Sequence, residues 1–407
     1  MRASTPLRAL ANPSSLFQSQ HFYGNKSIAQ LSNKAAYPIS LKQMIAFGKD
    51  LTEERLLQSA SFVRQELPVR IAHRVRDLQN LPFVVGLNPH LERVYASYLE
   101  AFECLRKIPV IRTLDENDAF CEILKSLLES HSATIPRIMT GLLESASHLP
   151  PAPRERIMNR MLRSRISRRV LSEQHIALTA QYHDLHEHGP ISDGSRYIGI
   201  IDTRLCPFHT IKAIEVLLPL ITGVHTELIV EGNKGVTIAF IDAHLKYVVL
   251  ELVKNAVLAA TKARRAEDAK KIYITIADSP KFLGVRVSDL SGGIAADRDM
   301  PMDLDGRPLH QASRSSLLSF SHPRQLAYIP VLRDSTRLAA TIEEQVNTEA
   351  NERLGLPGQR KELAMSLGLC KVYAEYFGGS LQLFTMDGLG SDAYLRIPKT
   401  GVPAAIT

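Results

Sequence analysis

The spacing of apolar residues changes once along this chain, and that change does most to limit the folds it can adopt. From Leu41 to about His188, apolar residues recur every three or four positions, which is the spacing of one helix face. Prolines and short polar stretches divide this half into about four or five long helices. Helices with short connections pack against each other in antiparallel order. We therefore predict an antiparallel helical bundle over residues 39–190.

After Gly189 and Pro190 the sequence favours strands. Short runs rich in β-branched and aromatic residues are typical of strands. They lie at 227–231, 236–241, 271–277, 282–288, 381–384 and 392–397, with two strong helices at 243–264 and 367–377 between them. A mixed sheet with helices on one face predicts an α/β sandwich over residues 191–400, and the whole chain is then α+β. The polar segment 295–361 is long enough to be a functional lid or a disordered connection.

The net charge of +7 is concentrated near the N-terminus. Six Lys and Arg residues precede Asp50, the first acidic residue, so the remainder of the chain is almost neutral. A nucleic-acid binder would carry its basic excess on the folded surface, and the observed distribution argues against that class. A basic stretch rich in Ser, Ala and Leu is typical of a mitochondrial transit peptide. We predict that residues 1–38 are a transit peptide or a disordered polar tail.

The cysteines and the longest apolar run argue against several other classes. The four cysteines are Cys104, Cys121, Cys206 and Cys370. Their spacing matches neither a disulfide framework nor a zinc site, so we expect reduced and mostly buried thiols. The longest apolar run, 216–224, is interrupted by Pro219 and Gly223 and is too short to span a bilayer.

Two charged clusters on the expected helices look like binding sites, but we interpret both as structural. His183, His186 and His188 fall at a helix end, where solvated side chains explain them better than a metal site does. The basic stretch 160–169 is interleaved with apolar residues. That pattern predicts a core helix whose arginines extend outward to solvent, rather than a surface for nucleic acid or anionic lipid.

Three short motifs in the second half point to a nucleotide site. Glu251 and Asn255 are four residues apart on a helix and share one face, where a carboxylate could orient a nucleophile and an amide oxygen could hold a metal. Asp289 ends an expected strand, and the glycines after it permit close approach to a purine ring. The helix near Gly368 offers its N-terminus to phosphate. Each motif alone is also compatible with an ordinary helix or turn, and only the ordered set indicates nucleotide binding.

The order of these motifs resembles the ATPase superfamily of gyrase, the heat-shock chaperones, histidine kinases and mismatch-repair proteins, known as GHKL. Longer blocks are similar to one branch, the mitochondrial 2-oxo-acid dehydrogenase kinases, which include the pyruvate and branched-chain enzymes. These blocks are 65–73, 81–89, 164–169 and 373–383. The resemblance covers nearly all of the chain from Leu41 to Ile397 and implies a helical bundle followed by a GHKL-type ATP-binding domain.

The resemblance implies a role for particular residues. Glu251 matches the general base that accepts the proton of the substrate serine, and Asn255 matches the ligand of Mg²⁺. Asp289 matches the residue that accepts a hydrogen bond from the adenine amino group, with Gly293 in the floor of that site. Positioning and charge neutralisation would then supply most of the catalysis.

Two further groups of residues follow from the same resemblance. Ser366, Leu367 and Gly368 stand roughly where the family has the loop G-x-G-x-G-L-P, and we expect them to bind the nucleotide. His131 and Arg165 match positions that line a regulatory carboxylate pocket in the helical domain.

The nucleotide motifs depart from the family pattern in places. Leu290 and Ser291 replace an Arg and a Gly of the family's turn, and the glycine-rich loop near Ser366 is not intact. Lost glycines restrict the backbone near phosphate, so an active kinase and a pseudokinase that only binds the complex both stay open. Tyr247 stands where pyruvate-type members have His, and together with block 81–89 it favours the branched-chain type.

The resemblance finally implies a matrix protein serine kinase that uses ATP and Mg²⁺. It would phosphorylate and inactivate the decarboxylase α subunit of a 2-oxo-acid dehydrogenase complex, with the branched-chain complex favoured and the pyruvate complex possible. The implied partner for docking is the lipoyl domain of the acyltransferase core, and the implied assembly is a homodimer. A two-component histidine kinase is disfavoured, because no H-E-x-x-x-P phosphoacceptor motif is present.

Overall fold

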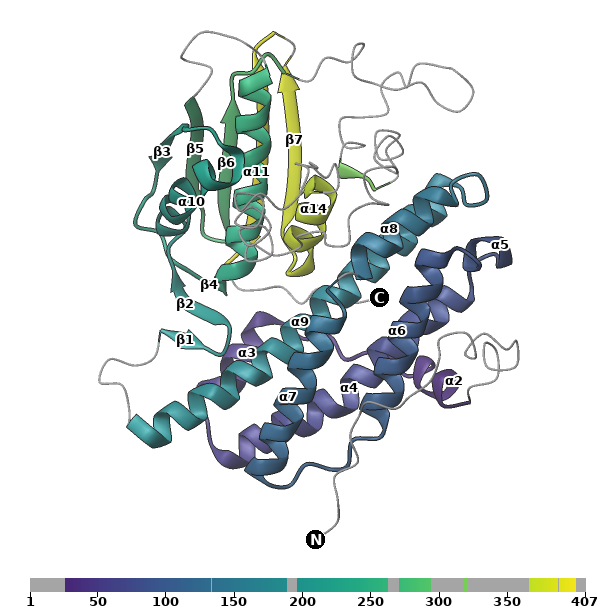
Figure 1. The fold of residues 1–407 in the computed structure, drawn as a ribbon. Coiled ribbons are helices and arrows are strands. Elements are labelled where there is room, and N and C mark those ends of the chain that lie inside the picture. Colours follow the sequence, from purple (N-terminus) through teal and green to yellow (C-terminus); the bar gives the residue numbers. More distant parts are fainter. Residues whose placement is uncertain are drawn as a thin grey trace.

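The fold consists of a helical region followed by a region of mixed sheets, which occupy opposite ends of the molecule (Figure 1). The computed structural model describes residues 26–132, 134–188, 196–262, 271–293, 318–320, 366–386 and 388–399. Within these ranges, the helix-rich first half and the strand-bearing second half confirm the α+β class.

Eight helices are described in the first region. They are α2 (Lys26–Ser32), α3 (Leu41–Gly48), α4 (Glu53–Gln79), α5 (Phe83–Gly86), α6 (Pro89–Arg106), α7 (Leu114–Ser130), α8 (Thr134–Glu144) and α9 (Pro151–His188). Side-chain caps begin several of them: Ser40, Thr52 and Thr113 each accept a hydrogen bond from a backbone N–H in the first turn. Such caps satisfy donors that the helix itself leaves without partners.

Pro68 does not end a helix, contrary to the sequence-based expectation. It lies inside α4, a single helix of 27 residues, and its side chain is buried. Proline removes one backbone hydrogen bond and costs about 3 kcal/mol in a helix interior. Apolar residues on both sides of Pro68, including Val63, Leu67 and Ile71, belong to the same core, so burial of both halves of α4 offsets that cost.

The folded part of the chain begins earlier than predicted. We expected residues 1–38 to precede the fold, but α2 packs on α4 with Ile28 in the core. The backbone N–H of Tyr37 also donates to the Glu66 carboxylate at 2.7 Å, and His73 Nε2 lies 2.8 Å from the Lys34 carbonyl. Residues 26–38 are therefore part of the fold, because their apolar and polar groups have partners on α4. Residues 1–25 lie outside the described part of the chain.

The longest helix, α9, is enclosed by other elements in its middle. Five consecutive residues, Ser164–Arg168, are buried, and five residues exceed one helical turn. The expectation that all arginines of this stretch reach solvent is therefore wrong for Arg165 and Arg168, which are buried and hydrogen-bonded. At the end of α9, His186 and His188 are exposed, as expected for a solvated helix end.

The second region contains two sheets and three described helices. Its elements are β1 (Tyr197–Ile198), β2 (Ile201–Leu205), α10 (Pro207–Thr222), β3 (Glu227–Gly232), β4 (Ile238–Ile241), α11 (Asp242–Lys262), β5 (Lys271–Asp278), β6 (Phe282–Asp289), α14 (Ser366–Tyr376), β7 (Ser380–Met386) and β8 (Gly390–Pro398). The small sheet has the order β1-β2-β4 and the large sheet β3-β5-β6-β8-β7. Among the described strands of the large sheet, only β3 and β5 pair in parallel.

The helices α10, α11 and α14 lie on one face of the large sheet (Figure 1). Alternate residues of its central strands are buried beneath them, as in the pairs Ile274–Val287 and Ile276–Val285. This alternation is the mark of a sheet with one covered face. The arrangement confirms the expected mixed sheet with helices on one face. The sequence-based prediction missed α10 and the β1–β2 hairpin.

Several other expectations concern cysteines, membranes and the lid. All four cysteines are free, and all except Cys104 are buried, as predicted. Among the described residues, no helix has both the length and the apolar character needed to cross a membrane. The proposed lid, 295–361, lies outside the described residues apart from Leu318–Phe320. Ser319 there donates to the Glu155 carboxylate at 2.7 Å, which ties this short piece to α9.

Candidate active site

The helix α11 presents Glu251 and Asn255 on one face, as their spacing predicts. Glu251 is only 1 % exposed, and the Lys254 ammonium contacts its carboxylate at 2.8 Å. A carboxylate in such a buried position keeps a fixed orientation and is shielded from bulk water. The Asn255 side chain is half-buried and donates from Nδ2 to the Glu251 backbone carbonyl at 2.7 Å.

A second helix, α14, completes this face. It packs against α11 in antiparallel order, since Tyr373 contacts the ring of His244 and Cys370 Sγ lies 3.9 Å from the Val248 carbonyl. The N-terminal end of α14 therefore reaches the part of α11 that carries Asn255. There the Asn255 amide donates a second hydrogen bond, at 3.1 Å, to the hydroxyl of Ser366. Residues 111 positions apart in the chain are thus brought into direct contact.

Asp289 stands at the C-terminal end of β6, as predicted, and is 8 % exposed. Its Oδ1 accepts hydrogen bonds from both the backbone N–H and the hydroxyl of Ser291. The turn is therefore capped by the residue that replaces a family glycine. Both bonds use the same oxygen, so Oδ2 is the carboxylate atom that could accept a hydrogen bond from a ligand.

A side chain would not fit at the glycines of the predicted nucleotide site, for a different reason at each position. Gly292 and Gly293 have φ angles of 97° and 78°, which disfavour any residue with a Cβ. A Cβ on Gly293 would also lie 2.4 Å from the Met386 carbonyl oxygen. Gly368 packs directly against the ring of Phe320, which a Cβ would meet at 2.8 Å. Leu367 is packed against the core, so any contact it makes with nucleotide must be limited.

The polar groups of this face fit magnesium and a nucleotide. Mg²⁺ prefers oxygen ligands. Both hydrogen bonds of the Asn255 amide use its nitrogen, which leaves the oxygen as the atom suited to a cation. Asp289 and the glycines at 292 and 293 combine an acceptor with backbone free of side chains, which suits a flat heterocyclic ring.

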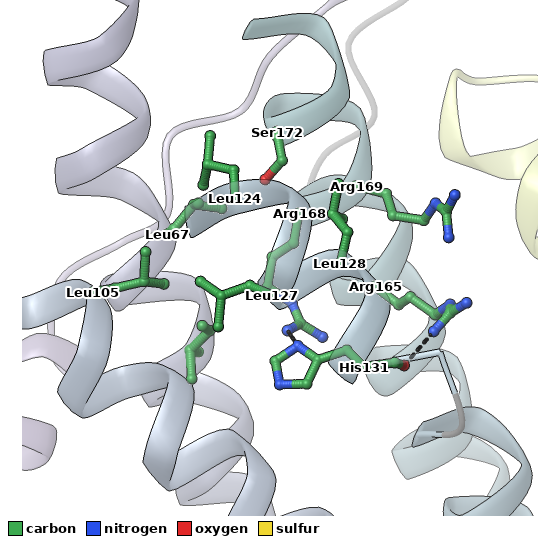
Figure 2. A pocket seen from close by; sticks show the side chains of 11 residues that line it. Leu67, Leu105, Leu124, Leu127, Leu128, His131, Arg165, Arg168, Arg169 and Ser172 are labelled. Carbon is green, nitrogen blue, oxygen red and sulfur yellow. Dashed lines mark hydrogen bonds between the residues drawn. The ribbon is translucent and has the colours of Figure 1, made fainter. Parts of the chain in front are cut away.

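A separate cavity in the helical region contains the other two predicted residues, His131 and Arg165 (Figure 2). It lies between α4, α6, α7 and α9. Its lining has an apolar part and a cationic part, formed by Leu67, Ile71, Leu105, Leu124, Leu127, Leu128, His131, Arg165, Arg168, Arg169 and Ser172. Arg165 donates to the His131 backbone carbonyl at 2.8 Å. That carbonyl ends α7, where a cation is favoured by the helix dipole.

The charge of this cavity is positive. Burial, with the nearby Arg168 guanidinium, lowers the pKa of His131 to about 3, so its ring is neutral at physiological pH. Arg168 points toward that ring, as Figure 2 shows, and its Nη1 lies 3.4 Å from His131 Nδ1. It also donates to the Tyr98 hydroxyl at 3.0 Å and the Ser164 carbonyl. Among the described residues, no carboxylate forms an ion pair with Arg168. The cavity can therefore favour an anion.

Three residues contribute to these sites without having been predicted. Lys254 pairs with Glu251, and the i, i+3 spacing on one helix could have indicated it. Ser291 caps Asp289 through a short local turn, a pattern common for Ser near Asp. Arg168 could not be separated from its neighbouring arginines by sequence alone, because the enclosure of α9 depends on the packing of other helices.

The chain is similar to mitochondrial dehydrogenase kinases. Residues 38–202 match a family model described as mitochondrial branched-chain alpha-ketoacid dehydrogenase kinase. The chain is 28 % identical to pyruvate dehydrogenase (acetyl-transferring) kinase 2, mitochondrial, of Saccharomyces cerevisiae, over 96 % of this chain and 88 % of that protein. It is 28 % identical to the mitochondrial pyruvate dehydrogenase kinase of Arabidopsis thaliana, over 89 % of this chain and 90 % of that protein. It is 27 % identical to pyruvate dehydrogenase (acetyl-transferring) kinase isozyme 3, mitochondrial, of Mus musculus, over 91 % of this chain and 83 % of that protein.

Proposed function

We propose that this chain, which belongs to the mitochondrial 2-oxo-acid dehydrogenase kinase family, is an ATP-dependent protein serine kinase of the mitochondrial matrix. Its substrate would be the decarboxylase α subunit of a 2-oxo-acid dehydrogenase complex, which phosphorylation would inactivate. The observation that carries the proposal is the meeting of Glu251, Asn255 and Ser366 at the contact of α11 and α14. Glu251 and Asn255 lie one turn apart on α11, so a buried carboxylate lies near an amide oxygen suited to a cation, and Ser366 approaches that amide from α14.

The second region would be a GHKL-type ATP-binding domain over residues 191–400, with a lid over 295–361. The helical domain, 39–190, would serve regulation and docking. The mixed sheet with α10, α11 and α14 on one face supports the first of these assignments. The cationic cavity supports the second, since His131 and Arg165 would line a pocket for a small regulatory carboxylate.

Each residue would then contribute one physical task. Glu251, fixed within α11, would accept the proton of the serine hydroxyl as that oxygen attacks. Asn255 would hold Mg²⁺ through its amide oxygen, and the bound ion would neutralise charge on the phosphates. Asp289 would accept a hydrogen bond from the adenine amino group on Oδ2. Because Lys254 contacts the Glu251 carboxylate, the serine hydroxyl must reach that carboxylate beside the ammonium.

The target complex is the finer part of the proposal. The matched family model is described by a branched-chain substrate, whereas the relatives compared above are named for pyruvate dehydrogenase. Tyr247, in place of the His of pyruvate-type members, favours the branched-chain complex. Its hydroxyl stays neutral, because burial and then the charge of Glu251 raise its pKa well above the usual value.

The test offers radiolabelled ATP and Mg²⁺ to the full-length protein with purified branched-chain or pyruvate dehydrogenase complex in separate reactions. We expect serine labelling of one complex. In Glu251→Gln, transfer should fall roughly 10²- to 10⁴-fold, the usual contribution of a general base, while nucleotide binding is retained. The matched control is Glu375→Gln, the same change at a half-buried position of α14. Full activity of Glu251→Gln would remove Glu251 from its assigned role.

A pseudokinase is the second candidate, and one observation favours it. The Ser291 hydroxyl donates a hydrogen bond to Asp289 Oδ1, and the family turn has a glycine at this position. This bond would compete with adenine for the Asp289 carboxylate and weaken adenine recognition. Labelling of neither complex, together with binding to the acyltransferase core, would establish this binding function instead. The family resemblance also supports docking on the lipoyl domain and a homodimer. Sedimentation of the protein alone and with isolated lipoyl domain tests both interactions.

A further inference from the structure

The Asn255 amide is held by two acceptors that belong to different helices. One is the backbone carbonyl of Glu251, at 2.7 Å on its own helix, and the other is the hydroxyl of Ser366, at 3.1 Å on α14. A carboxamide nitrogen carries two hydrogens, so two acceptors can satisfy both and fix the plane of the group. The Glu251 carbonyl can only accept, and a flipped amide would bring two oxygens into contact.

This orientation decides which atom of Asn255 is presented to a ligand. Because the two acceptors bind its nitrogen, the amide presents its oxygen, which is a suitable ligand for Mg²⁺. A single acceptor would leave the amide freer to rotate about its Cβ–Cγ bond. The Ser366 hydroxyl restrains this rotation from outside α11, because it approaches from a second helix.

The position of Ser366 is determined by the packing of the two helices. Farther along the contact, Cys370 lies against the Val248 carbonyl, and Tyr373 lies against the His244 ring. These buried contacts set the register between α14 and α11. Ser366 itself is 9 % exposed. The hydroxyl is a feature of this chain, because the family loop that stands roughly here carries glycine.

We propose that Ser366 is a positioning residue that holds the Asn255 amide with its oxygen presented to the divalent cation of the bound nucleotide. This inference rests on the proposed function, since it requires a cation at Asn255. It also explains how the chain can lose a loop glycine and keep a metal ligand in order. A fixed hydrogen bond from a neighbouring helix replaces part of what a glycine-rich loop would otherwise supply.

The test measures metal-dependent nucleotide binding rather than phosphate transfer. The full-length protein is incubated with the fluorescent nucleotide mant-ADP and titrated with MgCl₂. In Ser366→Ala the Mg²⁺ concentration for half-saturation should rise about fivefold, the effect expected for loss of one hydrogen bond. Affinity for mant-ADP in EDTA should not change. Ser366→Gly should behave like Ser366→Ala, and Ser366→Thr should restore the wild-type value because it keeps the hydroxyl.

Two controls separate positioning from general damage. Lys371→Ala changes the same helix outside the contact with α11, where Lys371 pairs with Glu375 at 4.0 Å, and should leave the Mg²⁺ titration unchanged. Asn255→Ala should abolish the Mg²⁺ dependence. If Ser366→Ala and Ser366→Gly required the same Mg²⁺ concentration for half-saturation as the wild-type protein, the role of Ser366 would be overturned and the proposed function would not be affected. Nucleotide binding by the wild-type protein that shows no Mg²⁺ dependence would overturn the proposed function, and this inference with it.

Discussion

The two candidate sites differ in whether their buried charge has an opposite charge beside it. In the helical region, Arg168 is buried among neutral acceptors, namely a carbonyl, a tyrosine hydroxyl and a neutral histidine. In the α/β region, the buried carboxylate of Glu251 is already matched by Lys254. A charge without a counter-charge in a low-dielectric interior attracts a ligand of opposite sign. The cavity is therefore suited to capturing an anion, whereas the α11 site is suited to acting on a substrate proton.

The largest expected effect comes from breaking the balance at the α11 site. Lys254→Met removes the ammonium next to Glu251 and leaves its carboxylate as a buried charge. We expect the free energy of unfolding to fall by on the order of 3 kcal/mol, the cost of breaking a buried ion pair. The double variant Lys254→Met with Glu251→Gln should recover most of that loss in urea denaturation. Equal stability of the single and double variants would show that Lys254 does not compensate Glu251.

The corresponding change in the cavity should affect ligand binding more than folding. Arg168→Met removes a cation whose partners are neutral, so no opposite charge is left behind. Affinity for a small 2-oxo carboxylate such as pyruvate should fall roughly 10- to 100-fold, the range for a hydrogen bond to a charged group. Isothermal titration calorimetry measures this loss. Arg163→Met is the matched control, because Arg163 lies on the same helix but pairs with Glu375. Equal affinity in both variants would place the carboxylate elsewhere.

Each region also contains a buried histidine that should make stability fall in acid. Burial lowers the pKa of His131 and of His244 to about 3 in each case. Below pH 6.5 the unfolded chain binds protons that the folded chain does not, so stability falls as the pH decreases toward 3. The slope is roughly 1.4 kcal/mol per pH unit for each histidine. His131→Phe should reduce the slope of urea midpoints between pH 6.5 and 5.5.

A bound carboxylate should make the two regions differ in this response. It should favour protonated His131 and reduce the wild-type slope, while the contribution of His244, at the start of α11, is unchanged. A carboxylate that leaves the slope of the wild-type protein unaltered would show that no anion binds next to His131.

The smallest effect concerns the contact between the two regions. Arg163 on α9 and Glu375 on α14 form an ion pair at 2.8 Å, and both side chains are 31 % exposed. Solvent screening limits such a pair to about 0.2–1 kcal/mol. A double-mutant cycle with Arg163→Ala and Glu375→Ala should give a coupling energy in that range. A larger value would mean that the regions are joined through this pair more strongly than its exposure suggests.

Local spacing predicted part of the candidate site, and contacts between distant elements could not be predicted. The four-residue separation of Glu251 and Asn255 puts them on a common helix face, whatever that helix packs against. The contact of Asn255 with Ser366 depends on the register of two helices, which one sequence does not encode in a local pattern. The positions of His131 and Arg165 in a possible carboxylate pocket were proposed from family resemblance, and only the structure shows that Arg168 is buried beside His131.

The same distinction explains the errors in the fold. Pro68 looks like a helix end, yet it lies inside α4 because burial of the flanking residues outweighs the local cost. The helix α10 was not predicted; Pro219 lies inside it, and Gly223, whose φ is 69°, ends it. The early start of the fold at α2 was missed because its short helix has few apolar residues and is stabilised by α4.

The length of α9 has a consequence for how the protein unfolds. Its 38 residues extend about 57 Å at the usual helical rise, and its contacts include α4, α7 and α8 as well as α14 of the second region. Neither region can lose its structure without exposing part of this shared helix. Heating should therefore give a single calorimetric transition rather than two. The amide protons in the middle of α9 should exchange with solvent only when the whole molecule unfolds.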